Sequence, residues 1–473
     1  MLFSSMLFLW FFLPFTFLVY RIVPNACKNA FLLLMSLIFY SWGEPIYVFL
    51  MLASITVNYW LALCIHVSPV KKNLFHRRRM ILILAIVYNI GFLWWFKYSA
   101  TFAVNFNYLL GREVLRVKEI ALPLGISFYT FQALSYVIDV YWKKCDVQKK
   151  YLNLALYITF FPQLVAGPIV KYKDVEAQIV NRSTSMLQTS VGIKRFIYGL
   201  SKKVIISNSV AEIADKIFAC SYDSIDTKWL WVAVLLYTLQ IYYDFSGYSD
   251  MAIGLGKMFG FEFVENFNYP YVSRSIQEFW RRWHISLSTW FKEYVYIPLG
   301  GNRKGKYRTY ANLIIVFVVT GVWHGATLNF LVWGIYYAFF IVMERIFLSK
   351  ILERNPIKVL NHVYTMFIVS VGWAIFRCDS LKEALKLIRY LFKWQNNQVY
   401  YWYDFFSIRS IVIVILAVLL IGFIQENSKK VKAVIMNTQK VYTAEFFLQI
   451  FLLAICMVLL ISGQYNPFIY FKF

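Results

Sequence analysis

The chain has 473 residues, of which 60% are hydrophobic, 20% aromatic and only 15% charged. An ordinary soluble domain is about 45–50% apolar and about 25% charged, so the composition excludes a typical water-soluble protein. Spread over spans of about 20 residues, the apolar content allows about ten to fourteen membrane crossings. We therefore expect an all-α, polytopic membrane protein.

The net charge of +24 comes from 48 Lys and Arg against 24 Asp and Glu. The basic residues gather in loops between apolar runs, as the positive-inside rule expects of cytoplasmic loops. Basic residues and stacking aromatics do not alternate within a polar domain, which argues against a nucleic-acid partner. The six cysteines form no C-x-x-C pair and have no histidine at metal spacing, so we expect no metal site.

The N-terminal part predicts one span and a helical hairpin. Residues 2–20 are apolar, and no small-residue cleavage site follows them, which favours a retained span over a signal peptide. Residues 30–66 exceed one crossing and are interrupted by turn residues at 43–45. A loop without acidic residues follows, so it is cytoplasmic and the N-terminus lies outside. Its basic residues are Lys71, Lys72, Arg77, Arg78 and Arg79.

Further spans are expected at 80–98 and 121–141, and four lysines between 143 and 150 mark the cytoplasmic side again. Residues 151–170 are apolar but contain helix-breaking residues, which predicts a broken or re-entrant element. Such backbone is tolerated at membrane depth only inside protein or beside a water-filled cavity, and we expect a wet cavity here. The breaking residues are Pro162, Gly167 and Pro168.

The middle of the chain is more polar. The basic stretch 190–220 predicts a helix at the cytoplasmic surface, and spans are expected after it at 229–243 and 247–262. Residues 272–308 carry eight Lys and Arg and are expected on the cytoplasmic side. The apolar stretch 309–348 is long enough for two crossings, joined near the sequence His-Gly at its centre.

The C-terminal part predicts one surface helix and two spans. In residues 380–393, Leu381, Ala384, Leu385, Ile388, Leu391 and Phe392 share one helical face. This pattern is typical of an interfacial amphipathic helix. Spans at 407–424 and 443–463 flank a basic stretch at 429–432, which places the C-terminus outside.

Two of the five histidines are candidates for chemistry. His324 lies in VTGVWHGATLNF, and an ionisable group at membrane depth is a functional hypothesis by default. The alternative is a neutral imidazole hydrogen-bonded between helices. His284 lies among tryptophans beside Arg281 and Arg282. Arginine and tryptophan suit an anionic, partly aromatic ligand, and they equally suit an interfacial aromatic belt.

Two carboxylates lie in the otherwise apolar segment IYYDFSGYSDMAIGLGKMFGF, at Asp244 and Asp250. A buried carboxylate needs a partner, and we expect a histidine or arginine from another helix. The glycines of this segment are explained by close helix packing. The chain has no H-E-x-x-H, P-loop, G-x-S-x-G or dinucleotide-binding motif.

Five segments together resemble the membrane-bound O-acyltransferase family over nearly the whole chain. The likeness is strongest to the bacterial branch that O-acetylates exported polysaccharides. The segments are LPLGISFYTFQALSYVIDVY (122–141), FFPQLVAGPIVKY (160–172), YYDFSGYSDMAIGLGKMFGF (242–261), NFNYPYVSRSIQEFWRRWHISLSTWFKEYVYIPLGGNR (266–303) and VTGVWHGATLNFLVWGIYY (319–337).

The resemblance implies one membrane domain, residues 1–473, with transmembrane and re-entrant helices in a ring around a central tunnel. It implies that His324 is catalytic and that His284 is a second signature histidine near the cytoplasmic opening. Tyr470, in the terminal FIYFKF, corresponds to a tyrosine proposed to relay the acyl group. We expect Arg281, Arg282, Asp244 and Trp323 to contact substrate.

The resemblance also implies the reaction. We expect acetyl transfer from cytoplasmic acetyl-CoA to hydroxyls of an exported polysaccharide, directly or through an extracytoplasmic partner. No tightly bound cofactor is expected. The bacterial cytoplasmic membrane is the expected location, with both termini outside. D-alanyl transfer to teichoic acid from a carrier-protein thioester is an alternative. A transporter for a polysaccharide or lipid-linked sugar is another, with intramembrane His and Asp as a proton relay.

Overall fold

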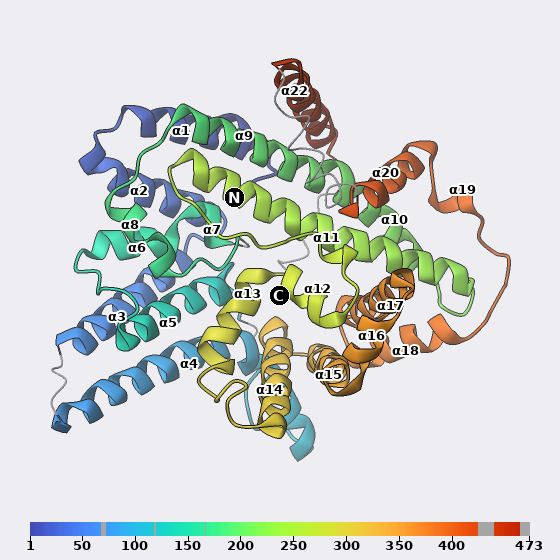
Figure 1. Cartoon of the computed structure of the whole chain (residues 1–473), viewed down its shortest axis with the longest axis horizontal. Helices are drawn as coiled ribbons and strands as arrows, with labels where there is room; N and C mark the ends of the chain where they lie inside the picture. Colours follow the sequence, from blue (N-terminus) through green and yellow to red (C-terminus); the bar gives the residue numbers. More distant parts are fainter. Residues whose placement is uncertain (68–71, 118–119, 166, 424–438, 464–473) are drawn as a thin grey trace. The chain divides into compact units, whose positions relative to one another are not determined.

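The computed structural model describes residues 1–67, 72–117, 120–165, 167–423 and 439–463. Secondary structure in these residues is helical throughout, without a β-strand, so the predicted all-α fold is confirmed (Figure 1). Tyr470 and the basic stretch 429–432 lie outside the described residues.

Five of the described helices are long and apolar enough to cross a membrane. They carry many exposed large hydrophobic side chains, including Phe49, Trp60 and Phe451, as lipid-facing helices require. The five stretches are Tyr47–Val67 (α3), His76–Leu110 within α4 (Lys72–Leu110), Leu328–Arg354, which begins with α15 (Leu328–Met343), Lys358–Arg377 (α17) and Thr443–Ile461 within α22 (Gln439–Ile461).

Internal packing divides the described chain into two compact units. The first comprises Met1–Phe196 and Met251–Val264, and the second comprises Ile197–Asp250 and the described residues from Glu265 onward.

In the first unit, the predicted helical hairpin is present, because α2 ends at Ser41 and α3 begins at Tyr47. The predicted first span is a π-helical turn, Phe8–Phe12, that continues into α1. An aromatic cluster of Phe8, Phe12, Phe39 and Phe161 joins these elements. The helices of this unit are α1 (Leu13–Ile22), α2 (Lys28–Ser41), α3, α4, α5 (Ile126–Trp142), α6 (Tyr151–Thr159), α7 (Phe161–Leu164), α8 (Tyr172–Val180) and most of α9 (Met186–Ser201).

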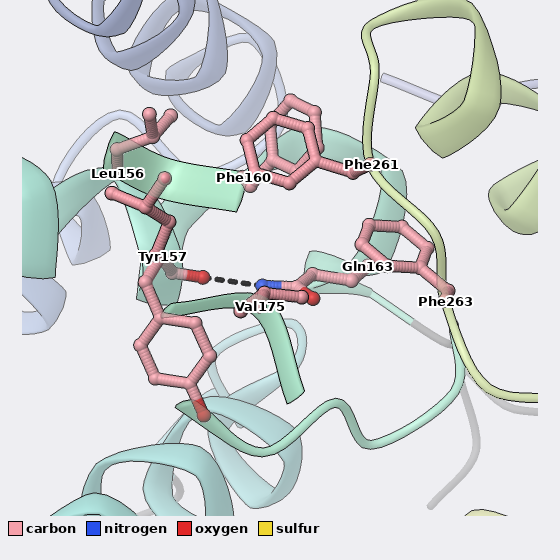
Figure 2. Close-up of a pocket in the computed structure, with 8 residues that line it drawn as sticks. Leu156, Tyr157, Phe160, Gln163, Val175, Phe261 and Phe263 are labelled. Atoms are coloured by element: carbon pink, nitrogen blue, oxygen red, sulfur yellow. Dashed lines mark hydrogen bonds between the residues drawn. The ribbon is translucent and has the colours of Figure 1, made fainter. Parts of the chain in front are cut away.

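The predicted break in 151–170 is also present, between α6 and α7 at Phe160. Gln163 Nε2 donates to the carbonyl oxygen of Tyr157 at the open end of α6 (Figure 2). The wet cavity expected here stays a prediction. The pocket beside the break is small and lined mainly by apolar and aromatic side chains, among them Phe261 and Phe263. The same lining also carries the polar side chains of Tyr157 and Gln163.

Two long helices occupy the middle of the chain. Residues 186–218 form one continuous helix, from α9 through a π-helical segment, Lys202–Ser207, to α10 (Asn208–Phe218). One side of it is buried in protein, and its predicted place at the cytoplasmic surface stays a prediction. The two spans expected at 229–243 and 247–262 are a single helix, α11 (Thr227–Met258). The residues between the two predicted spans, 244–246, continue this helix without interruption.

The remaining helices belong to the second unit. The predicted pair of crossings in 309–348 is present as α14 and α15, joined by residues 325–327. Gly321 and Gly334 allow their close approach, because a Cβ at either would come within 2.4 Å of a backbone oxygen of the opposite helix. These helices are α12 (Ile276–Arg282), α13 (Ile285–Phe291), α14 (Lys306–His324), α15, α16 (Ser349–Arg354), α17, α18 (Leu381–Phe392), α19 (Trp402–Phe405), α20 (Ile408–Leu419) and α22.

The predicted amphipathic helix is α18, and Ser380 caps it by accepting from the Glu383 backbone N–H. The buried residues are Ala384, Leu387 and Leu391, spaced as one helical stripe. Leu385 and Phe392, which were expected on the apolar face, are exposed. The buried stripe packs against α17 and α15.

Candidate active site

His324 is the last residue of α14 and is almost fully buried. Its imidazole lies among aromatic rings, with centroid distances of 4.8 Å to Trp323 and 5.2 Å to both Trp333 and Phe376. Gly325 follows in extended backbone, and a Cβ there would lie 2.1 Å from the Phe330 ring. The glycine of the W-H-G sequence therefore allows the chain to turn into α15 against this ring.

His284 and His324 lie on the same side of the second unit although forty residues separate them. The Trp323 ring is 6.5 Å from the His284 ring and 4.8 Å from the His324 ring, so it links the two imidazoles. Phe245 of α11 contacts His284 edge-on at 4.7 Å. The structure thus brings both predicted histidines, together with Trp323, into one buried aromatic environment.

His284 is held in an unusual backbone conformation, with φ 44° and ψ 55°. This left-handed region is uncommon for residues other than glycine. Such strain persists only where the surroundings hold it, and it is concentrated at functional sites. His284 is the N-cap residue of α13, and its side chain makes no capping hydrogen bond there.

Asn266 determines the proton position on His284. The Ser286 backbone N–H donates to Asn266 Oδ1 at 3.3 Å, so the oxygen of this amide must face the His284 side. His284 Nδ1 lies 3.0 Å from the same oxygen. Because a carbonyl oxygen only accepts, Nδ1 carries the hydrogen and the lone pair is on Nε2. Asn266 Nδ2 donates to Ser249 Oγ at 3.0 Å, which ties this arrangement to α11.

Burial lowers the pKa of His284 to about 3. The desolvated interior disfavours the imidazolium ion. His284 is therefore neutral at physiological pH, and its Nε2 can accept a hydrogen bond or a proton but has none to give.

The prediction that a histidine or arginine pairs with Asp244 is wrong, because the partner is a lysine. Asp244 is buried and pairs with Lys203 at 2.6 Å, and both side chains are nearly inaccessible. Asp250, two turns later on α11, pairs with Lys202 at 2.6 Å. The two lysines begin the π-helical segment of residues 202–207, and such segments occur frequently at functional sites.

Close helix packing lies between these two ion pairs. A Cβ at Gly247 would be 2.8 Å from the Gly199 carbonyl oxygen, so only glycine allows the contact. The structure gives Asp244 a role in fastening α11 to the helix of residues 186–218. Direct contact of Asp244 with substrate remains a prediction.

The two arginines differ in their surroundings. Arg281 is exposed on α12. Arg282 pairs with Glu278 at 2.9 Å and donates to the Asn268 carbonyl oxygen at 3.1 Å. Arg281 is thus the better placed of the two to meet a ligand from solvent.

Sequence reasoning missed three residues of this site: Lys203, Asn266 and Trp333. Asn266 opens the NFNYPYV segment that was recognised as a motif, so that signal was available. Lys203 was read as part of a basic surface, and Trp333 as one apolar residue of a span. Their contacts depend on tertiary packing.

The comparison with known proteins matches the part of the chain that contains this site. A model of the membrane-bound O-acyltransferase (MBOAT) family matches residues 147–382, which include both histidines and Asp244. The chain is 37% identical to "Probable alginate O-acetylase AlgI" of Pseudomonas putida, over 100% of both chains. This chain belongs to the MBOAT family. It is therefore a multi-pass membrane protein and an O-acyltransferase.

Two other relatives refine the likeness. The chain is 37% identical to "Peptidoglycan O-acetyltransferase" of Helicobacter pylori, over 82% of this chain and 79% of the other. It is 29% identical to "Teichoic acid D-alanyltransferase" of Bacillus subtilis, over 54% of this chain and 68% of the other. The family recognised from the sequence motifs is confirmed. The MBOAT model ends before Tyr470.

Proposed function

We propose that this MBOAT protein transfers an acetyl group from cytoplasmic acetyl-CoA to a hydroxyl of an exported polysaccharide, in the bacterial cytoplasmic membrane. The observation that carries the proposal is the pair of buried histidines around Trp323, in a chain similar over its full length to an alginate O-acetylase. Transfer occurs directly or through an extracytoplasmic partner.

His324 acts as the general base. A hydroxyl is a weak nucleophile at neutral pH, and a positioned base contributes about 10²–10⁴-fold. The hydroxyl oxygen attacks the thioester carbonyl carbon while His324 takes its proton. The C–S bond then breaks, and the CoA sulfur takes the proton from His324, which restores the neutral imidazole.

His284 positions a reactant. With Nδ1 committed to Asn266, its Nε2 accepts a hydrogen bond from the hydroxyl or from an amide of the donor. The aromatic rings around His324 exclude water, which protects the thioester from hydrolysis.

The predicted orientation of both termini outside is compatible with the two long helices in the middle of the chain, neither of which is among the five apolar stretches named above. If the helix of residues 186–218 crosses outward and α11 crosses back, both the stretch before 186 and the basic stretch 272–308 remain cytoplasmic. The sequence prediction assigned no crossing to the first and two to the second. The two differences cancel, so the N- and C-termini stay outside in this proposal.

Tyr470 is the proposed carrier of the acyl group on the outer side. A phenol has a pKa of about 10, well below that of a sugar hydroxyl, so its ester forms more readily and remains reactive. The alternative is an interfacial aromatic belt formed by the terminal aromatics. Replacing Tyr470 with Phe removes only the hydroxyl. Polysaccharide acetylation at the wild-type rate would refute the relay.

D-alanyl transfer from a carrier-protein thioester is the second candidate, favoured by the similarity to a teichoic acid D-alanyltransferase. The transporter alternative loses its ground because the family consists of acyltransferases.

The test is reconstitution of the purified protein in proteoliposomes with labelled acetyl-CoA on one side and polysaccharide on the other. Label in ester linkage on the polysaccharide, or on an added partner, supports the proposal. Transfer only from a D-alanyl carrier thioester would replace acetyl with D-alanine. No transfer from either donor would refute both.

A further inference from the structure

A loop rich in aromatic and carboxamide side chains follows α18. Residues 393–407, named here the aromatic loop, have the sequence KWQNNQVYYWYDFFS. Trp394 is 87% exposed, Trp402 55% and Tyr403 61%. Asn396 and Gln398 are exposed as well. In a membrane protein, such a concentration of exposed rings marks either a binding surface or a membrane interface.

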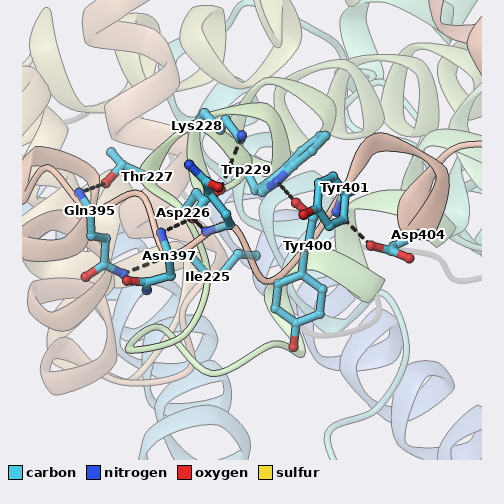
Figure 3. A network of polar contacts seen from close by, with 11 residues as sticks. Ile225, Asp226, Thr227, Lys228, Trp229, Gln395, Asn397, Tyr400, Tyr401 and Asp404 are labelled. Atoms are coloured by element: carbon cyan, nitrogen blue, oxygen red, sulfur yellow. Dashed lines mark hydrogen bonds and ion pairs between the residues drawn. The ribbon is translucent and has the colours of Figure 1, made fainter.

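Asp226 fixes the middle of the aromatic loop to the N-terminal end of α11. Its buried carboxylate accepts from the backbone N–H group of Asn397 at 2.5 Å (Figure 3). It also accepts from the backbone N–H group of Gln398 at 3.1 Å. Lys228 pairs with the other carboxylate oxygen at 3.2 Å. Gln398 is in the left-handed region at φ 56°, a conformation that these contacts maintain.

Two further anchors hold the flanks of the loop. Thr227 donates its hydroxyl to the Lys393 carbonyl oxygen at 2.6 Å and accepts from the Gln395 backbone N–H at 3.1 Å. Trp229 Nε1 donates to the Tyr400 carbonyl oxygen at 3.1 Å (Figure 3). The backbone is thereby ordered, so its exposed rings are presented without the entropy cost that a mobile loop would carry on binding.

The position of the loop in the chain assigns it to the outer side. It lies between α17 and α20, and the sequence stretches at the other ends of these helices, 349–358 and 429–432, are basic. Basic stretches mark the cytoplasmic side. The loop also contacts residues 222–229, the turn that the proposed topology places outside. The two assignments, made from different helices, agree.

We propose that the aromatic loop binds the acceptor polysaccharide outside the membrane, with sugar rings stacked on Trp394, Trp402 and Tyr403. This inference rests on the proposed function. The C–H face of a pyranose ring carries partial positive charge and suits the negative face of an aromatic ring. The exposed amides of Asn396 and Gln398 both donate and accept, as sugar hydroxyls require.

A lipid-facing aromatic belt is the competing explanation, and the composition disfavours it. Four consecutive carboxamide residues, 395–398, separate Trp394 from the other rings. Carboxamides are costly to place in the apolar part of a bilayer because their hydrogen bonds to water are lost. They fit a surface that meets a hydroxyl-rich polymer.

The test measures glycan binding by the full chain in lipid nanodiscs, separately from acetyl transfer. The probes are chitotetraose and an oligomannuronate, titrated by calorimetry. We expect Trp394→Ala and Trp402→Ala each to weaken binding of the better probe about tenfold, the scale of one lost aromatic contact. Trp402→Phe should keep most of the affinity. Trp60→Ala, a control on the exposed face of α3, should match wild type.

Three results would overturn the inference: binding of neither probe by the wild type, wild-type affinity in both alanine variants, or quenching of Trp394 and Trp402 fluorescence by brominated lipids. The last would assign the rings to the membrane. His324→Ala should bind the probe like wild type. If the proposed function is wrong, the protein should bind glycan but transfer no acetyl group. If this inference is wrong, the loop variants should transfer acetyl with an unchanged KM for the polymer.

Discussion

The ion pair between Lys203 and Asp244 makes a quantitative prediction about stability. The Nζ–Oδ1 distance is 2.6 Å, and the two side chains are 3% and 2% exposed. Changing Lys203 to Met keeps the length of the side chain and removes its charge. The Asp244 carboxylate then loses the Lys203 ammonium in a site with almost no solvent exposure. Breaking a buried pair in this way costs about 3–5 kcal/mol.

The neighbouring pair is a matched control. Lys202 and Asp250 have the same separation of 2.6 Å, but their side chains are 30% and 18% exposed. Lys202→Met should cost about 1 kcal/mol, because water solvates the remaining carboxylate. The double variant Lys203→Met/Asp244→Leu removes both buried charges and should recover most of the lost stability.

Thermal unfolding followed by fluorescence-detected size exclusion ranks these variants. We expect Lys203→Met to unfold at a clearly lower temperature than Lys202→Met, the double variant and the wild type. Equal midpoints for Lys203→Met and Lys202→Met would refute the reasoning from burial. A double variant no more stable than Lys203→Met would show that Asp244 acts through contacts other than this pair.

Three further predictions concern the site and its orientation. The pKa of His284 is about 3 in the folded chain, below its usual value of 6.5, so the unfolded chain binds the proton first as pH falls through 6.5. The free energy of unfolding should therefore drop by about 2 kcal/mol by pH 5. In thermal unfolding, His284→Gln should flatten this pH dependence. Arg281→Ala should raise the KM for acetyl-CoA several-fold and weaken the salt dependence of this KM, and both effects should be larger than those of Arg282→Ala. Equal effects of the two variants would contradict the inference that Arg281 is the better placed to meet the donor. Cysteine at Asn397 should react with an impermeant thiol reagent only from outside and at Lys304 only from the cytoplasm; labelling from the opposite sides would reverse the topology.

Hydrophobic runs and turn residues were enough to predict most helices. The breaks at residues 43–45, at Phe160 and after His324 are all present, because Pro and Gly act on the local backbone. The failure at α11 has the opposite origin. The sequence prediction divided this segment at residues 244–246, whereas the lysines of the adjacent π-helical segment pair with Asp244 and Asp250 within one continuous helix. That compensation comes from a distant segment and cannot be read locally.

In the candidate site, too, the sequence predicted some residues and missed others whose role depends on distant contacts. The sequence identified His284, His324 and Trp323 through their unusual positions and motif resemblance, and the structure brings them together. It did not identify Asn266 as the residue that orients His284, because that role depends on a hydrogen bond across eighteen residues. A periodic pattern reports which face is buried but not which polar groups meet there.

The most direct measurement of the central claim is the rate of labelled acetyl transfer by His324→Ala and by the less disruptive His324→Gln in proteoliposomes. Both variants should insert and purify as monodisperse protein, bind acetyl-CoA like wild type, and transfer acetyl about 10²–10⁴-fold more slowly, the loss expected for a missing general base. Transfer at the wild-type rate by either variant would contradict the role of His324 and with it the proposed mechanism.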